Sequence, residues 1–163
     1  MKKITVLGVT GSIGMQTVDV VMNHPEQFKI TAMAAGYNVA KVEEILAMID
    51  VEYICMVKKE DALYLQEKYP DLKVVYGESG LIEIATLPEI EIVLNAIVGF
   101  AGLVPTIEAI KAKIPRGARY MTYRMTVMIT SLKSTIIWKS CVSGWLCKYL
   151  FSAKPKNNAK TII

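Results

Sequence analysis

Short apolar segments alternate with amphipathic segments through the first 113 residues of the chain. Apolar runs bounded by turn residues have the pattern of buried strands; they are Ile4–Leu7, Lys29–Ala35, Tyr53–Val57, Leu72–Tyr76 and Ile90–Leu94. Segments whose apolar residues recur at helical spacing follow them; they are Ile13–Met22, Val39–Ile49, Glu60–Lys68, Ser79–Thr86 and Val104–Lys111. This βαβαβ order predicts an α/β fold with a doubly wound parallel sheet.

The alternation stops after Lys113. Ile114–Arg124 combines proline, glycine and three arginines without a clean period, and only Thr126–Leu132 and Thr135–Trp138 have the composition of strands. We therefore expect the sheet to be incomplete at its C-terminal edge, with Ile90–Leu94 exposed as an apolar edge strand unless one of these segments pairs there. Such an edge favours aggregation, so we expect marginal stability and poor solubility.

The charge of the chain changes at the same place. All 15 acidic residues precede residue 113, whereas residues 114–163 carry nine lysines and arginines and no acid. A composition shift this sharp predicts two parts, residues 1–113 and a basic tail, residues 114–163. The tail could bind nucleic acid or an acidic membrane with strong salt dependence. Its positive charges follow no helical spacing, so we expect neither partner and keep this function as an alternative.

Composition excludes several other classes of protein. No window of 18 apolar residues is free of charge, and the short strand after Met1-Lys2-Lys3 does not resemble a secretory signal. Cys55, Cys141 and Cys147 are too few and too scattered for a disulfide framework, which indicates a cytoplasmic protein whose cysteines are small buried hydrophobes. With His24 as the single histidine, no zinc site is expected.

Three glycines follow the first predicted strand at a spacing of three residues. Gly8 permits a tight turn, Gly11 permits close approach to a pyrophosphate, and Gly14 permits close packing of the next helix on the strand. The N–H groups and the positive dipole end of that helix would then face the anion. The turn is therefore a candidate dinucleotide site.

The segment after the second strand bears on which dinucleotide binds. NAD enzymes usually place a carboxylate there, about 20 residues past the glycines, to bind the ribose 2′-hydroxyl. Here the chain reads Ala34-Ala35-Gly36, without a carboxylate, and Asn38 and Lys41 follow. This favours NADP over NAD. Alternatively, Gly36 and Asn38 form only a turn and a helix cap.

The segment after the fifth strand, Asn95–Gly102, is apolar and glycine-containing. It could lie under a flat ring, although ordinary strand-to-helix packing is the interpretation we prefer. We expect Tyr64, Tyr69 and Tyr76 to be surface or packing residues and His24 to be a cap or surface residue. No paired carboxylates and no Ser-His-Asp set emerge, so we predict no catalytic residue and no metal ligand in this chain.

Four motifs together make the chain resemble the 1-deoxy-D-xylulose 5-phosphate reductoisomerase family over residues 1–113. The family's GSTGSIG turn is matched by Gly8–Gly14 and is followed by Thr17-Val18-Asp19-Val20. Its A-G-x-N-V, G-E-x-G-L and N-A-I-V-G-x-A-G-L-x-P-T motifs are matched by Ala35–Val39, Gly77–Leu81 and Asn95–Thr106.

The resemblance implies a Rossmann-like NADPH-binding domain. The implied cofactor-binding residues are Thr10, Gly11, Ser12, Ile13, Gly36, Tyr37 and Asn38. Family members often carry Lys or Arg where this chain has Tyr37, which removes a positive charge near the 2′-phosphate. The family enzyme is an oxidoreductase of isoprenoid biosynthesis, typically a homodimer. It rearranges 1-deoxy-D-xylulose 5-phosphate, a phosphorylated sugar, and reduces the product with NADPH to 2-C-methyl-D-erythritol 4-phosphate, using a divalent metal (Mg or Mn).

The chain departs from the family after Ala112. The family continues with a strand and A-L-A-N-K-E and later supplies metal ligands from a D-S-E-type segment, whereas this chain reads Lys113-Ile114-Pro115-Arg116-Gly117 and contains neither motif. We hypothesise that a frameshift near residue 112 replaced the native continuation, with fusion or splicing to a basic segment as the rival. The chain would then be an inactive, non-dimeric fragment. Another NADP-binding Rossmann oxidoreductase domain is the alternative within the same class.

Overall fold

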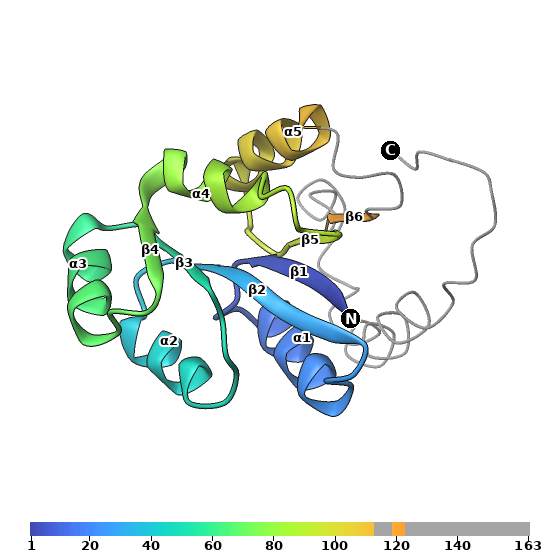
Figure 1. The fold of residues 1–163 in the computed structure, drawn as a ribbon. Helices are drawn as coiled ribbons and strands as arrows, with labels where there is room; N and C mark the ends of the chain where they lie inside the picture. Colours follow the sequence, from blue (N-terminus) through green and yellow to red (C-terminus); the bar gives the residue numbers. More distant parts are fainter. Residues whose placement is uncertain (113–118, 123–163) are drawn as a thin grey trace, which may run out of the picture. The chain divides into compact units, whose positions relative to one another are not determined.

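The computed structural model describes residues 1–112 and 119–122, all within one compact unit, Met1–Met128 (Figure 1). The strands are β1 (Lys2–Leu7), β2 (Phe28–Ala35), β3 (Tyr53–Met56), β4 (Lys73–Tyr76), β5 (Ile92–Asn95) and β6 (Arg119–Thr122). The helices are α1 (Ser12–Asn23), α2 (Val39–Leu46), α3 (Lys59–Lys68), α4 (Gly77–Ala85) and α5 (Leu103–Lys111), with a 3₁₀ turn, η1 (Phe100–Gly102), before α5. All ten elements predicted before residue 113 are confirmed, with small shifts at their ends.

The strands form one sheet in the order β4-β3-β2-β1-β5-β6, and every pair is parallel. From β1 the chain moves outward through β2, β3 and β4, then returns to place β5 on the other side of β1. The predicted α/β doubly wound sheet is therefore confirmed. The strand order reverses between β1 and β5, and a ligand crevice is expected at the carboxyl ends of strands at such a point.

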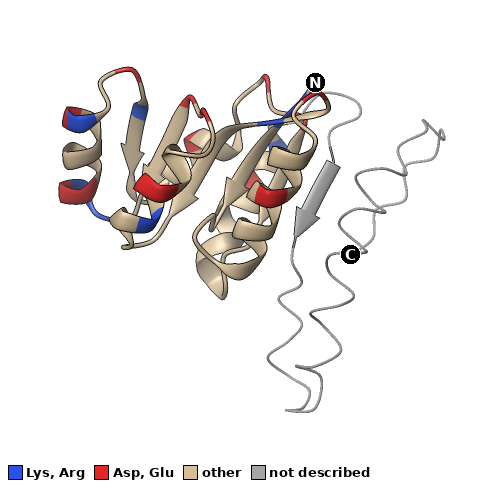
Figure 2. Cartoon of the chain, turned by 90° about the horizontal axis from the view of Figure 1, so that it is seen from below, with Lys and Arg blue, Asp and Glu red and all other residues tan. Residues whose placement is uncertain are grey.

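The helices cover both faces of this sheet (Figure 1). In that view α1 and α2 lie on one face and α4 and α5 on the other. The right-handed rule for parallel crossovers explains this division, because the direction of travel along the sheet reverses after β4. Charged residues of both signs lie mostly on the helices and loops, and the strands are largely uncharged (Figure 2).

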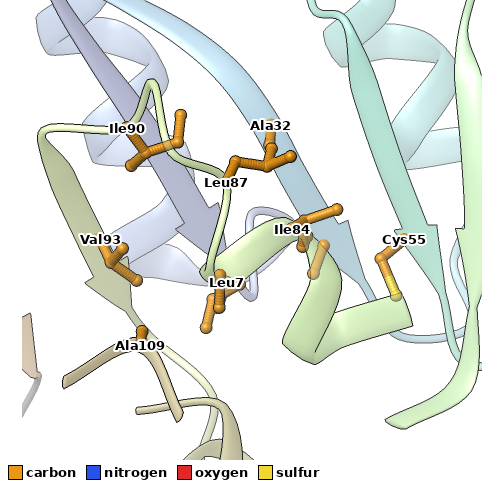
Figure 3. Packing of buried hydrophobic residues seen from close by; sticks show 10 residues of the cluster. Leu7, Ala32, Cys55, Ile84, Leu87, Ile90, Val93 and Ala109 are labelled. Carbon is orange, nitrogen blue, oxygen red and sulfur yellow. The ribbon is translucent and has the colours of Figure 1, made fainter. Parts of the chain in front are cut away.

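One hydrophobic cluster lies under α4 and α5. Leu7 of β1, Ala32 of β2 and Val93 of β5 meet Ile84 of α4 and Ala109 of α5, and all five are buried (Figure 3). The buried Thr5 hydroxyl on the same face donates a hydrogen bond to the Ile84 carbonyl at 3.0 Å. These contacts hold β1, which carries the glycine turn, at the centre of the sheet.

Cys55 belongs to this cluster. Burial raises the pKa of its thiol to about 12, with a smaller contribution from the Glu83 carboxylate. The expectation that Cys55 is a small buried hydrophobe is confirmed. Cys141 and Cys147 lie outside the described residues.

The expected exposed edge at the fifth strand is wrong. β6 pairs with β5 in parallel, with Ile92 opposite Arg119 and Asn95 opposite Thr122. The pairing was missed because a four-residue strand is too short to display a period, and because edge pairing needs backbone groups rather than an apolar pattern. Thr126–Leu132 and Thr135–Trp138, the segments considered for this role, lie outside the described residues.

Candidate functional site

The turn between β1 and α1 requires glycine at its first position. Gly8 has a φ of 86°, in the left-handed region, and its N–H donates to the Ala34 carbonyl at 3.0 Å. A Cβ on Gly8 would lie 3.0 Å from the carbonyl carbon and oxygen of Ala96, just past β5. The turn is therefore fixed against β2 on one side and against the segment after β5 on the other.

Gly14 lets α1 approach the turn. A Cβ there would lie 2.3 Å from the Val9 carbonyl oxygen and 2.4 Å from the Val9 Cα. Backbone atoms cannot rotate away as a flexible side chain could, so only glycine fits. The packing roles predicted for Gly8 and Gly14 are confirmed by this geometry.

Gly11 has no comparable steric role within the protein. A Cβ on Gly11 would meet only the Gly8 carbonyl oxygen, at 3.4 Å, which is ordinary contact. Gly11 is exposed and is the N-cap of α1, with a φ of −78°. The close approach of a ligand to its backbone remains a reason for glycine here, as the sequence predicted.

The first turn of α1 has the properties of an anion site. No side chain caps the helix, no acidic residue lies in its first turn, and Ser12 is exposed. The first N–H groups of a helix have no intrahelical acceptor, and the helix dipole places partial positive charge there. The N–H groups of Ser12 and Ile13, which follow Thr10 and Gly11, therefore lack an intrahelical acceptor at the switch point of the sheet.

The segment after β2 lies at the same edge of the sheet. A Cβ on Gly36 would meet nothing within 4 Å, and Tyr37 is 67% exposed. The Asn38 Oδ1 accepts a hydrogen bond from the Lys41 N–H at 3.0 Å and caps α2. The helix-cap interpretation of Asn38 is confirmed, and its amide NH₂ group keeps two donors for a ligand. The Lys41 ammonium pairs with Glu44.

Lys58 adds a positive charge that the sequence interpretation did not include. Its Nζ lies 5.4 Å from the centroid of the Tyr37 ring. Lys58 is the N-cap of α3 and follows β3, the strand next to β2. Its position just past a predicted strand was the signal available in the sequence.

Asn95, at the end of β5, organises the third segment. Its Nδ2 donates to the Gly102 carbonyl at 2.7 Å and to the Thr106 Oγ1 at 2.8 Å, and its Oδ1 accepts from the Ile97 N–H at 3.0 Å. A Cβ on Gly102 would lie 2.6 Å from the Asn95 Nδ2. The buried amide thus fixes residues 96–102 as a loop, a role that the sequence did not reveal.

The outer side of this loop is apolar and exposed. Val98 is 84% exposed and Phe100 is 79% exposed, whereas Asn95 and Gly102 are buried. Ordinary strand-to-helix packing therefore accounts for the ends of the segment and not for its middle. Three segments lie at the carboxyl ends of neighbouring strands: the glycine turn after β1, a polar turn with a nearby lysine after β2, and an apolar loop after β5.

Residues 4–115 match the sequence profile of the 1-deoxy-D-xylulose 5-phosphate reductoisomerase family. The chain belongs to this family. The match covers more than half of the chain and ends close to the point where the regular sequence pattern ends. The resemblance inferred from four short motifs is confirmed.

Individual members of the reductoisomerase family agree with this assignment. The enzyme of Bacillus cereus (strain Q1) is 45% identical over 113 residues, which cover 69% of this chain and 30% of that protein. The enzyme of Halalkalibacterium halodurans is 46% identical over 114 residues, with the same coverage. The chain thus spans about a third of the length of the curated relatives it matches.

Solved reductoisomerase structures share the fold. A DOX-P reductoisomerase with fosmidomycin and magnesium superposes with a TM-score of 0.68 at 31% identity, over 75% of this chain and 30% of that one. The Zymomonas mobilis reductoisomerase in complex with NADPH gives a TM-score of 0.67 at 25% identity, over 76% of this chain and 32% of that one. The Rossmann-like architecture is therefore that of the family's N-terminal domain.

The remaining candidates have structural roles. The His24 N–H donates to the Val21 carbonyl at 3.1 Å and caps the end of α1, as predicted. The Lys68 Nζ lies 5.6 Å from the Tyr64 ring centroid and 5.8 Å from that of Tyr69. Within residues 1–112 and 119–122, no three His, Cys, Asp or Glu side chains are placed to hold a metal ion. No helix in the same residues is long and apolar enough to cross a membrane.

Proposed function

We propose that residues 1–113 form the NADPH-binding domain of a 1-deoxy-D-xylulose 5-phosphate reductoisomerase. The observation that carries this proposal is the uncapped N-terminus of α1, with Gly11 and Ser12 exposed at the switch point of the sheet. Membership of the family and the shared fold of an NADPH complex support it.

We assign each of the three segments to one part of the cofactor. The N–H groups of Ser12 and Ile13, with Thr10 and Gly11 beside them, would bind the pyrophosphate, since a helix N-terminus favours an anion. The turn Gly36-Tyr37-Asn38 would receive the adenosine ribose, because its backbone is open and no Asp or Glu occurs between residues 27 and 42. The apolar loop held by Asn95 would receive the nicotinamide, and the bound cofactor would supply the hydride.

The complete reaction requires groups that this chain does not contain. The family reaction, rearrangement and reduction of 1-deoxy-D-xylulose 5-phosphate, uses a divalent metal. Residues 114–163 contain no Asp or Glu. We therefore propose that the chain binds NADPH without reducing the sugar phosphate and without forming the family homodimer. The basic tail, residues 114–163, is then a second part without a role in the cofactor site.

A charge placed at the N-cap of α1 tests the cofactor site. Asp is a preferred N-cap residue, so Gly11→Asp should preserve the helix, yet its carboxylate would repel a pyrophosphate. Titration of the full chain with NADPH, followed by cofactor fluorescence, should show binding that Gly11→Asp abolishes. Tyr76→Asp is the matched control, because Tyr76 is the N-cap of α4 at the far side of the sheet.

Two results would contradict the proposed function. Equal weakening by Gly11→Asp and Tyr76→Asp would show that charge alone, and not the α1 site, determines binding. Salt-dependent binding of duplex DNA together with no response to NADPH would instead favour a binding module that uses the basic tail. The frameshift hypothesis has its own test, which is whether a shifted frame of the downstream DNA encodes A-N-K-E and D-S-E motifs.

A further inference from the structure

We propose that Lys58 binds the 2′-phosphate of NADPH and thereby selects NADPH over NADH. This inference rests on the proposed function and adds a residue to its site. The turn after β2 lacks an unpaired cation of its own: position 37 is tyrosine, and the Lys41 ammonium is paired with Glu44. If the 2′-phosphate of NADPH binds at this turn, the positive charge that selects it must come from another segment.

The sheet brings Lys58 next to that turn. β2 and β3 are parallel neighbours, and Ala35 lies opposite Met56 at the ends of their register. Tyr37 comes two residues after Ala35, and Lys58 comes two residues after Met56. The two residues therefore occupy equivalent places beyond the carboxyl ends of adjacent strands. The 5.4 Å separation between the Lys58 Nζ and the Tyr37 ring centroid confirms that the two side chains meet.

Lys58 is an available cation. Five other lysines of residues 1–112 pair with a glutamate, namely Lys29, Lys41, Lys68, Lys73 and Lys111. No ion pair of Lys58 occurs within that range, and its side chain is exposed. Its contact is the face of Tyr37, which attracts an ammonium group without neutralising it.

Tyr37 acts as a positioning residue. A lysine side chain has four rotatable bonds and loses rotamer entropy when it is fixed. Contact with the Tyr37 ring restrains it at the edge of the sheet where the adenosine ribose is expected. A phosphate dianion placed there would form a charge-assisted hydrogen bond with the Lys58 ammonium. Lys58, positioned by Tyr37, thus supplies the positive charge that a lysine or arginine at position 37 would otherwise provide.

The test compares the dissociation constants of NADPH and NADH for the full chain. Lys58→Gln should weaken NADPH binding about tenfold and leave NADH binding unchanged, because only NADPH carries the 2′-phosphate. Lys59→Gln is the matched control: Lys59 lies over Tyr76, at the end of β4, with its Nζ 5.8 Å from the ring centroid. It should change neither constant. Adding Tyr37→Lys to Lys58→Gln should restore the preference for NADPH.

The outcomes separate this inference from the proposed function. Binding of NADPH by the wild type that Lys58→Gln leaves unchanged, or weakens no more than NADH binding, overturns the inference and leaves the proposed function intact. A wild-type chain that binds neither dinucleotide overturns both. Lys58 and Lys59 are exposed, so thermal unfolding of both variants should match the wild type and exclude misfolding as a cause.

Discussion

Replacing Gly14 by alanine tests whether the packing of α1 on the glycine turn is as close as the structure shows. Gly14 is the third residue of α1, where Gly→Ala would ordinarily stabilise a helix by up to about 1 kcal/mol. The structure predicts the opposite sign. The new methyl carbon would lie 2.3 Å from the Val9 carbonyl oxygen and 2.5 Å from the Gly8 carbonyl oxygen.

The size of the effect follows from what must move. All three nearest atoms belong to the backbone of Gly8 and Val9, so the clash is relieved only if α1 or the turn shifts. Overpacking of this kind costs about 1–3 kcal/mol, and the absence of a flexible neighbour places Gly14→Ala at the upper end. After subtraction of the gain in helix propensity, we expect the free energy of unfolding to fall by about 2 kcal/mol.

The assay is urea unfolding of the full chain, followed by circular dichroism. Gly36→Ala is the control, since its Cβ meets nothing within 4 Å and its φ lies outside the left-handed region; it should change the stability by less than about 0.5 kcal/mol. The urea dependence of the free energy should be the same for all variants, so that the midpoints are comparable. A Gly14→Ala variant as stable as the wild type, or more stable, would refute the close packing.

Three further predictions concern groups around the site and the core. Asn95→Leu removes three hydrogen bonds of a buried amide and should lower the free energy of unfolding by about 3 kcal/mol in the same assay, at about 1 kcal/mol for each bond; a loss below about 1 kcal/mol would contradict its role. In a chain whose other two cysteines are replaced by serine, Cys55 should resist a thiol reagent at pH 8 until urea unfolds the protein, because burial raises its pKa to about 12; rapid labelling of the folded chain would show that the thiol is accessible. The Lys29 ammonium, 2.8 Å from the Glu52 carboxylate, lowers the pKa of Glu52, so the pair stabilises the fold above the ordinary carboxyl pKa of 4.5 and this contribution is lost as the pH falls through the lower folded value. Glu52→Gln should therefore cost less than about 1 kcal/mol at pH 7 and nothing at pH 2, as urea midpoints at the two pH values will show, and an equal cost at both would contradict the ion pair.

The order of the elements could be predicted because each one buries a recognisable face. Strands such as Ile92–Asn95 are buried along their whole length, and they appear in the sequence as short continuous apolar runs. α2 buries Val42 and Ile45, which lie at helical spacing. These signals are local, so they can be recognised without knowledge of the tertiary structure. The strands β1 to β5, the five α-helices and the three loops at the carboxyl ends of β1, β2 and β5 follow from them, whereas β6 does not.

The parts that escaped prediction depend on contacts between distant residues. The Asn95 amide forms hydrogen bonds with groups seven and eleven residues away in the sequence. The sequence does not give the path of the loop that brings these groups to the amide. Lys58 and Tyr37 are adjacent only because β2 and β3 pair in the register that places Ala35 opposite Met56. Asn95, Lys58 and Tyr37 are residue types that are common in loops, and their contacts form only in the folded chain.

The candidate site lies at the centre of the sheet, away from the strand that follows the sequence change after residue 113. The glycine turn follows β1, and the other two loops follow β2 and β5, the two strands that flank β1. The edges of the sheet are β4 and β6, so β6 pairs only with the outer side of β5. Every segment proposed to contact the cofactor, from Thr10 to the loop of residues 96–102, also precedes the end of the family match at residue 115. A change in β6 therefore acts first on the backbone pairing of β5 and on stability, whereas the geometry of the glycine turn depends on contacts with Ala34 and Ala96.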